Sequence, residues 1–206
     1  MDPDAWDERY ATADLVWSST PNQFVAELVG PMPPGRALDV AAGEGRNAIW
    51  LVERGWTVVA TDFSPVAVER MRRIADERLH DRASALTARV ADATVPPPAG
   101  VPGYDLVLFS YLQLPDDEWL LALRAGVDAT APDGRVVIVM HALRNLTEGY
   151  GGPPHAEVLH DPDDVMAAVT DLPVEVESAT LRTRVVPTDD GERAALDTVV
   201  VLRRVS

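Results

Sequence analysis

A glycine-rich turn between a strand and a helix constrains the fold of this chain more than any other feature. The β-type run Arg36–Ala41 is followed by the turn Gly43-Glu44-Gly45, and a helical segment then extends to Arg54. A second β-type run, Trp56–Thr61, comes directly after that helix. Two strands joined by a crossover helix form a βαβ unit, which predicts a parallel sheet.

Alternation of β-type and helical segments continues along the chain. A third strand is expected to end at Ala91-Asp92-Ala93, and a fourth covers Tyr104–Ser110. The turn Pro132-Asp133-Gly134 leads into a fifth strand at Val136–Met140. The second and fifth strands are nearly continuous runs of β-branched residues, as expected when helices cover both faces of a parallel sheet.

The C-terminal segment differs, because its two β-type runs follow each other without a helix. They lie at roughly 174–186 and 196–204, and the short polar loop between them favours antiparallel pairing. We therefore expect an α/β fold. It is a Rossmann-like doubly wound sheet of five parallel strands plus a C-terminal antiparallel hairpin, with helices on both faces.

The length of 206 residues fits a single domain spanning 1–206. Within it, residues 1–30 are expected to form a helical cap that carries several aromatic side chains. Residues 142–161 are rich in glycine and proline. A loop of this length is uncommon in a compact domain unless it is functional, so we expect it to act as a lid.

Composition limits the partners and the chemistry. The net charge of −15 disfavours nucleic acid and polyanionic substrates, and it suits a neutral or amine-bearing small molecule better. The absence of cysteine and lysine excludes thiolate catalysis, Schiff-base lysines and the P-loop lysine, and no metal site is expected. Neither a membrane-spanning run nor a signal peptide is visible, so we expect a cytoplasmic protein. We expect it to be a monomer or a homodimer.

The turn itself matches a nucleotide-binding fingerprint. Gly43-Glu44-Gly45-Arg46-Asn47-Ala48 fits G-x-G-x-x-G/A directly after a strand and at the start of a helix. Asp62 ends the next strand, where an acid can accept hydrogen bonds from both ribose hydroxyls. These two features alone would also suit a nicotinamide cofactor.

Two further acids favour a cationic ligand. Asp39 lies inside the first strand, where dinucleotide-binding proteins normally place an apolar residue, and a buried carboxylate is costly unless it is paired. Asp92 follows the third strand, where it can accept from an adenine amino group. S-adenosylmethionine carries an ammonium and a sulfonium and has no pyrophosphate, so these acids favour it over NAD.

These motifs resemble the class I S-adenosylmethionine-dependent methyltransferases. The resemblance rests on Leu38–Asn47, Thr61-Asp62-Phe63-Ser64, Ala91-Asp92-Ala93 and Tyr104-Asp105-Leu106-Val107, and it covers roughly residues 5–204. Gly45-Arg46-Asn47 and the N-terminal Trp6-Asp7-Glu8-Arg9-Tyr10 are similar to the small tellurite-resistance and thiopurine methyltransferase-like branch.

The resemblance implies how the cofactor is held. The first-strand acid and the turn bind the methionine end, the second-strand acid binds the ribose, and the residues after it and after the third strand bind adenine. Many members carry glycine at position 41, and an alanine there is tolerable if its φ stays negative. The implied cofactor-binding residues are Asp39, Ala41, Gly43, Gly45, Arg46, Asp62, Phe63, Asp92, Ala93 and Ser110.

The acceptor site is less marked in the sequence. His141 follows the fifth strand and is the best placed general base, with Tyr111 as a second catalytic candidate. His141 also has a structural interpretation, as a satisfied histidine. Candidate substrate-binding residues are Tyr10, Trp17, Tyr111 and His155.

Three functions are compatible with these patterns. The favoured one is S-adenosylmethionine-dependent methyl transfer to a small-molecule acceptor, neutral or amine-bearing rather than an oxyanion. A non-catalytic S-adenosylmethionine-binding regulator would show the same cofactor motifs. A nicotinamide-dependent oxidoreductase fits less well, because it leaves Asp39 without a role.

Overall fold

The computed structural model describes residues 20–97 and 103–205. Most of the expected N-terminal cap, including Trp6, Tyr10 and Trp17, lies outside the described residues. The strands are β1 (Arg36–Val40), β2 (Thr57–Asp62), β3 (Leu86–Val90), β4 (Tyr104–Ser110), β5 (Thr130–His141), β6 (Val174–Thr188) and β7 (Gly191–Arg204). The helices are α2 (Gln23–Val29), α3 (Arg46–Glu53), α4 (Pro65–Leu79), α5 (Asp116–Ala129), α6 (Asn145–Glu148) and α7 (Pro162–Ala168), with short 3₁₀ helices at His80–Ala85 and Ala156–Val158.

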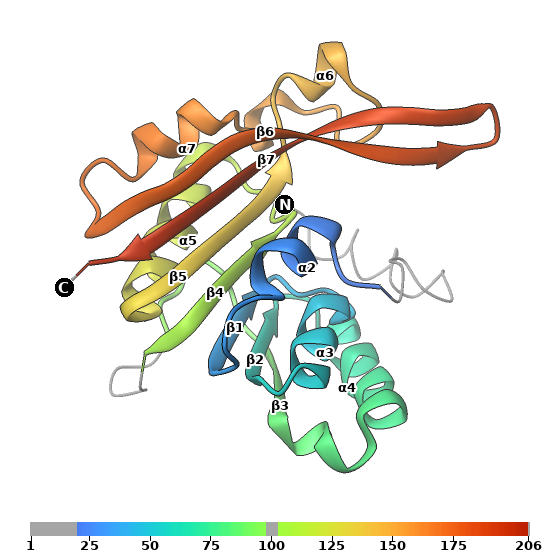
Figure 1. The fold of residues 1–206 in the computed structure, drawn as a ribbon, viewed down its shortest axis with the longest axis vertical. Coiled ribbons are helices and arrows are strands. Elements are labelled where there is room, and N and C mark those ends of the chain that lie inside the picture. Colours follow the sequence, from blue (N-terminus) through green and yellow to red (C-terminus); the bar gives the residue numbers. More distant parts are fainter. Residues whose placement is uncertain (1–19, 98–102, 206) are drawn as a thin grey trace.

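All seven strands form one sheet in the order β3-β2-β1-β4-β5-β7-β6 (Figure 1). Pairing from β3 through β5 is parallel, and β7 pairs antiparallel with both β5 and β6. The order reverses at β1 and β4, because β1 leads outward to β2 and β3 whereas β4 begins the other half. Ligands of such sheets bind at this reversal, beyond the carboxyl ends of the strands. The expected fold class is confirmed.

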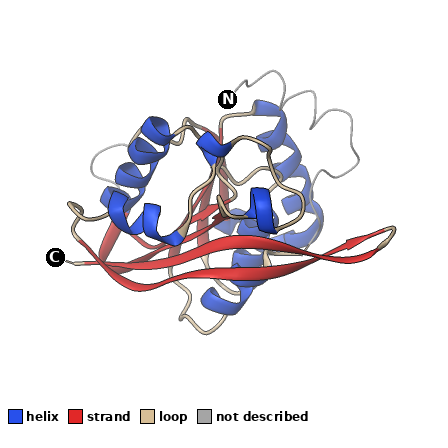
Figure 2. Ribbon diagram, turned by 90° about the horizontal axis from the view of Figure 1, so that it is seen from above, coloured by secondary structure: helices blue, strands red, loops and turns tan. Residues whose placement is uncertain are grey.

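Helices cover both faces of the sheet, and each face has its own hydrophobic core (Figure 2). Side chains alternate along each strand, so Ala37 packs on one face with α2, α3 and α4, and Leu38 packs on the other with α5 and α7. By the same alternation Asp39 lies on the α3 face. Since Val139 and Val199 also belong to that core, the ends of β5 and β7 send His141 and Asp197 to the α3 face as well.

Two helices show why the sequence folds locally as it does. Ser64 caps α4 by accepting a hydrogen bond from the Ala67 backbone N–H at 3.0 Å, and Pro65 occupies the first turn. Asp161 caps α7 through a capping box with Asp164. Among the described residues, no helix is long and apolar enough to cross a membrane.

The second half of the sheet differs in detail from expectation. The predicted turn Pro132-Asp133-Gly134 lies inside β5, which begins at Thr130, and the pairing with β4 shifts register there. Asp133 has a φ of 62° at this irregularity. The last two strands are longer than expected, and β5 pairs with β7 only from Asp197 to Arg203. The hairpin tip therefore projects past β5 (Figure 1).

Candidate active site

The glycine-rich turn follows β1 and changes direction through three residues with positive φ. These are Ala41 at 55°, Gly43 at 58° and Gly45 at 82°. Gly45 is the N-cap residue of α3, and a Cβ at this position would collide with the Met71 side chain. Glycine is thus needed at 45 both for its backbone conformation and for the close approach of α4.

The condition of a negative φ at Ala41 is not met, because its φ is 55°. The Ala42 backbone N–H donates to the Thr61 carbonyl at 2.8 Å, which draws the chain from β1 toward the end of β2. An alanine in the left-handed region costs about 1–2 kcal/mol. The turn therefore keeps a strained residue at the end of a strand that faces the ligand-binding edge.

Asp39 is fully buried in β1, and neither carboxylate oxygen has a close hydrogen-bond partner within the described residues. Burial raises the pKa of Asp39 to about 7, and the Arg46 guanidinium and the Ala48 backbone N–H offset burial only in part. A buried carboxyl group without a partner destabilises the protein. This position consequently favours a ligand that supplies positive charge or hydrogen-bond donors.

Asp62 is held at the end of β2 by backbone donors. Its carboxylate accepts from the Gly43 N–H at 2.8 Å and from the Ser64 N–H at 3.0 Å, and the residue is only 3% exposed. These bonds tie the glycine-rich turn to the start of α4. A carboxylate oxygen can accept more than one hydrogen bond, and binding of ribose hydroxyls by Asp62 stays a prediction.

The other expected cofactor residues surround the same edge of the sheet. Asp92 accepts hydrogen bonds from the Thr94 N–H and hydroxyl, both at 2.8 Å, and with Ala93 it lines a mostly apolar cavity of about 410 Å³ on the α5 face. Phe63 is half-buried beside Asp62 in the sequence. Ser110 ends β4, and its buried hydroxyl oxygen has no partner among the described residues.

Tyr111 follows Ser110 with a φ of 60°, which is unusual for a bulky residue. The centroid of the Tyr111 ring lies 4.6 Å from that of the His141 ring. The guanidinium carbons of Arg46 and Arg184 lie 5.8 and 5.7 Å from the same Tyr111 centroid. Burial raises the pKa of Tyr111, and the Asp197 carboxylate raises it further. The hydroxyl therefore stays protonated and is poorly suited to act as a general base.

A second and larger cavity, of about 830 Å³, opens beside Tyr111 on the α3 face. Its walls come from the segment before α2, the start of α3, the ends of β4 and β5, the 150–154 segment and the projecting part of β6. Lining residues are Thr20, Pro21, Asn22, Gln23, Arg46, Tyr111, Gln113, His141, Tyr150, Gly151, Gly152, Pro153, Pro154, Arg184, Val186 and Pro187.

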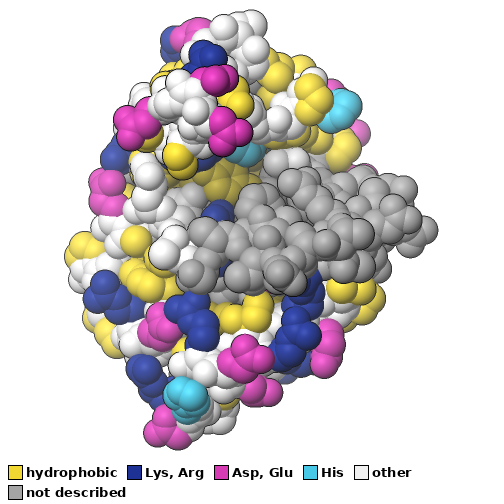
Figure 3. Space-filling view, turned by 90° about the vertical axis from the view of Figure 1, so that its right-hand side faces the viewer, with side chains coloured by type: hydrophobic (Ala, Val, Ile, Leu, Met, Phe, Trp, Pro, Cys, Tyr) yellow, Lys and Arg dark blue, Asp and Glu magenta, His cyan; other side chains and the backbone are white. Residues whose placement is uncertain are grey.

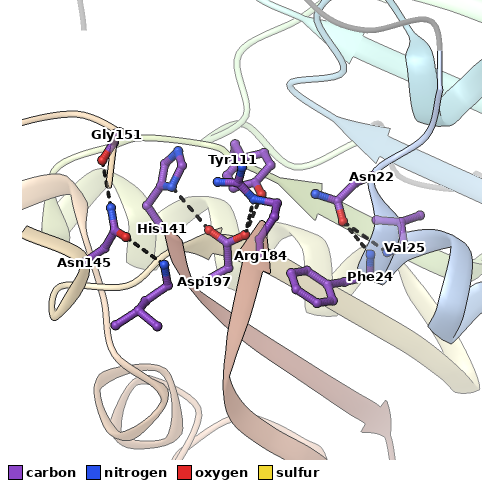
Figure 4. A network of polar contacts seen from close by, with 10 residues as sticks. Asn22, Phe24, Val25, Tyr111, His141, Asn145, Gly151, Arg184 and Asp197 are labelled. Atoms are coloured by element: carbon purple, nitrogen blue, oxygen red, sulfur yellow. Dashed lines mark hydrogen bonds and ion pairs between the residues drawn. The ribbon is translucent and has the colours of Figure 1, made fainter. Parts of the chain in front are cut away.

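Asp197 of β7 connects the polar residues beneath this cavity (Figure 4). Its side chain is fully buried, and its Oδ2 accepts from the Tyr111 hydroxyl at 2.8 Å and from Arg184 Nε at 2.7 Å. The other oxygen, Oδ1, lies 3.3 Å from His141 Nδ1. Burial alone would raise the pKa of Asp197, but the donors from His141, Arg184 and Tyr111 together lower it. Asp197 is therefore the anion at the centre of this network.

The other two histidines near the site lie apart from this network. His155 is exposed and does not line the cavity; its Nδ1 lies 3.7 Å from the Glu157 carboxylate. His160 is nearly buried and stacks on Trp119 with ring centroids 5.6 Å apart. Of the predicted acceptor-site residues within the described ranges, the structure thus brings His141 and Tyr111 together and leaves His155 at a distance.

The expected lid segment is partly anchored. Asn145 donates from its side chain to the Gly151 carbonyl at 2.8 Å and accepts from the Leu196 N–H at 2.7 Å. Gly152, with a φ of 81°, packs directly against the His141 ring, where a Cβ would lie 3.2 Å from Nδ1. This segment therefore forms a wall of the cavity, and its action as a lid stays a prediction.

Asp197 and Arg184 were not predicted from the sequence. Both lie in the C-terminal hairpin, and neither carries a motif. Asp197 is the direct cross-strand partner of His141, a relation that depends on the register between β5 and β7. Asn22 was missed as well; it caps α2, and its backbone N–H donates to the Asn47 side chain at 2.9 Å. The structure thus gives Asn47, part of the turn motif, a role in anchoring α2.

The chain is similar to known proteins both in the sequence around the glycine-rich turn and in its fold. Residues 37–134 match the family described as a methyltransferase domain. A thiopurine S-methyltransferase from Methylococcus capsulatus (strain ATCC 33009 / NCIMB 11132 / Bath) is 32% identical over 78 residues, which cover 35% of this chain and 35% of that protein. The chain spans at most 35% of the length of the curated relatives that it matches.

Two solved structures share the fold over nearly the whole chain. A protein studied for the conversion of a disulfide bond into a thioacetal group during echinomycin biosynthesis has a TM-score of 0.76 at 20% identity, covering 98% of this chain and 91% of that one. TehB from Haemophilus influenzae has a TM-score of 0.70 at 14% identity, covering 99% and 67%. The fold is that of a Rossmann-like α/β protein with a seven-stranded mixed sheet. The match of residues 37–134 to a methyltransferase domain and the shared fold agree with the resemblance to class I S-adenosylmethionine-dependent methyltransferases that the sequence predicts.

Proposed function

We propose that this chain transfers the methyl group of S-adenosylmethionine to a small-molecule acceptor that is neutral or amine-bearing. The observation that carries the proposal is the position of Arg46 and Tyr111. Arg46 begins α3 directly after the glycine-rich turn and interacts with Asp39. Arg46 and Tyr111 both line the 830 Å³ cavity. The cofactor edge and an acceptor-sized cavity therefore meet at these two residues.

The residues at the sheet edge fit this cofactor. Asp39 would face the ammonium group, because its buried carboxylate has no partner among the described residues and a cation favours its charged form. Arg46 would lie near the cofactor carboxylate, and Asp62 would accept from the ribose hydroxyls. Asp92, Ala93 and the side chain of Phe63 would enclose the adenine. When bound, the sulfonium supplies an activated methyl group.

The chain itself contributes position and exclusion of water. Methyl transfer is an in-line displacement, so holding the acceptor near attack distance supplies much of the rate. The acceptor cavity is closed on one side by Tyr150 and Gly152 and on another by Arg184 of the projecting hairpin. A volume of about 830 Å³ falls in the range of cavities that bind metabolite-sized ligands. A small oxyanion would leave most of it filled with water.

Two alternatives are tested directly by binding and turnover. A nicotinamide-dependent oxidoreductase would place a pyrophosphate at the turn, next to the buried carboxyl group of Asp39. A non-catalytic regulator would bind S-adenosylmethionine without releasing S-adenosylhomocysteine. The net charge of −15 also supports a protein that does not act on nucleic acid, and we propose a cytoplasmic monomer or homodimer.

Calorimetric titration with S-adenosylmethionine, S-adenosylhomocysteine and NAD tests the cofactor, and conversion of a labelled methyl donor with a panel of phenols, amines and thiols tests the activity. We expect binding of the first two ligands only, and acceptor-dependent release of S-adenosylhomocysteine. Tighter binding of NAD would overturn the cofactor assignment, and binding without turnover on any acceptor would support the regulator.

A further inference from the structure

We propose that Asp197 positions His141 as the general base of this site and that the acceptor group is an uncharged hydroxyl. The proposal rests on the proposed function and specifies its acceptor. It begins from the pairing of β5 with β7, in which His141 and Asp197 are directly opposite each other. Directly opposed residues of an antiparallel pair point to the same face, so the two side chains meet without any loop between them.

The two facing atoms have no other partner among the described residues. His141 Nδ1 and Asp197 Oδ1 are both buried, and neither makes another hydrogen bond there. They lie 3.3 Å apart, a contact that is slightly too long or misaligned for a good hydrogen bond. Catalytic contacts of this kind tighten when substrate binds. Because each atom would otherwise be an unsatisfied buried group, each is the natural partner of the other.

The remaining contacts of Asp197 keep it anionic and fixed. Arg184 Nε and the Tyr111 hydroxyl both donate to Oδ2, which leaves Oδ1 for the histidine. A carboxylate at Nδ1 selects the tautomer in which Nδ1 carries the hydrogen. The other nitrogen, Nε2, is then unprotonated, and the ring that carries it lines the acceptor cavity. This is the arrangement that a general base requires.

The charge of the cavity lining selects among acceptors that need a base. Among the described residues, the charged side chains of the lining are those of Arg46 and Arg184, and no aspartate or glutamate lines it. Figure 3 shows arginines interspersed with acidic side chains on the face toward which the hairpin tip points. A protonated amine would be repelled by this lining. A thiol, which ionises readily, would have little need of a positioned base.

In the proposed step, a lone pair on the acceptor oxygen forms the new C–O bond to the methyl carbon while the S–CH₃ bond breaks. The electron pair of the broken bond stays on sulfur, and S-adenosylhomocysteine results. The hydroxyl proton passes to His141 Nε2, and the imidazolium that forms is stabilised by Asp197 through Nδ1–H. The proton then leaves to water, which restores the neutral histidine.

The tautomer of His141 can be measured without any turnover. Nitrogen-15 NMR of the ligand-free protein, with the signal assigned through His141→Gln, is expected to show hydrogen on Nδ1 and none on Nε2 at pH 8. Hydrogen on Nε2 would overturn the proposal, whether or not the protein transfers methyl groups. Failure of the proposed function is separate, since it would appear as absent cofactor binding or turnover.

A variant then tests the positioning role. Asp197→Asn is expected to lower kcat by roughly 10²–10⁴-fold, because the amide favours the wrong tautomer. The affinity for S-adenosylmethionine should stay unchanged. The acid limb of the pH–rate profile should move to lower pH. The variant loses the Asp197 carboxylate that stabilises a protonated His141, whereas Arg184 from β6, Arg46 from α3 and Tyr111 remain around the ring. Asp190→Asn, in the exposed hairpin turn, is the matched control and should match the wild type.

The acceptor class is tested with three probes that share one ring: p-cresol, 4-methylbenzenethiol and 4-methylbenzylamine. We expect methyl transfer to p-cresol, lost in His141→Gln and retained in His80→Asn, which changes an exposed histidine at the far end of α4. Transfer only to the thiol or the amine, transfer to none of the three, or a His141→Gln variant as active as the wild type would overturn the proposal. So would an Asp197→Asn variant that folds and keeps the wild-type pH–rate profile.

Discussion

Replacing Asp39 by asparagine should stabilise the ligand-free protein at high pH while weakening cofactor binding. The two side chains have nearly the same shape, so the change removes a charge and little packing. Asp39 is fully buried, and its oxygens have no close partner within the described residues. The site therefore keeps a carboxylate at a cost to stability, which is expected where a residue is retained for a ligand.

The magnitude follows from the raised pKa. Burial raises the pKa of Asp39 from 3.8 to about 7, so the folded protein binds this proton more tightly than the unfolded chain. The stabilising contribution of the neutral carboxyl group is complete below pH 4 and is lost as the pH rises through 7. A pKa shift of this size corresponds to at most about 4 kcal/mol in the free energy of unfolding. Because water that reaches the site would lower this value, we expect an effect of about 2–4 kcal/mol.

The assay is thermal unfolding of the wild type and Asp39→Asn between pH 4 and pH 8.5. At pH 4 the two midpoints should be close, and at pH 8.5 the variant should unfold at a temperature higher by roughly 4–16 °C. Its affinity for S-adenosylhomocysteine should fall, because the ammonium group loses its carboxylate. A difference in midpoint that does not change with pH, or a variant less stable at pH 8.5, would refute this account of Asp39.

Three other substitutions test separate parts of the site. Ala41→Gly should raise the unfolding free energy by about 1 kcal/mol, since glycine tolerates the φ of 55°, and a lower unfolding midpoint would show that the alanine is unstrained. Asp62→Asn should weaken binding of S-adenosylhomocysteine by about 1–3 kcal/mol in calorimetry, and unchanged affinity would count against the ribose assignment. Asn145→Ala should leave the Leu196 N–H unpaired and speed its hydrogen exchange, whereas unchanged exchange at Leu196 would show that the 142–161 segment is held by other contacts.

The fold and the cofactor edge could be predicted because their signals are local. Alternation of strands and helices, the glycines of the turn and the acids at strand ends are all readable within short windows of sequence. The conformation of Ala41 was not readable, because it depends on the hydrogen bond from Ala42 to Thr61 across two strands. The start of β5 was missed for a similar reason, since its irregular part pairs with β4 through a register shift.

The acceptor site could be predicted only in part. His141 and Tyr111 stand at strand ends, where parallel sheets place ligand-binding residues, and both line the cavity. Their common partner Asp197 comes from a strand 56 positions after His141, and its role depends on the antiparallel register of the hairpin. The charge of the cavity also differs from the net charge of the chain, because Arg46 and Arg184 converge from α3 and β6. Net charge is therefore a poor guide to the acceptor.

A crystal structure with S-adenosylhomocysteine bound tests the central claim most directly. We predict the amino acid end of the ligand between Asp39 and the Gly43–Gly45 turn, its ribose at Asp62, and its sulfur facing the cavity lined by Tyr111 and His141. A ligand bound in the reverse direction, or one that binds elsewhere and leaves Asp39 buried without a partner, would contradict the account.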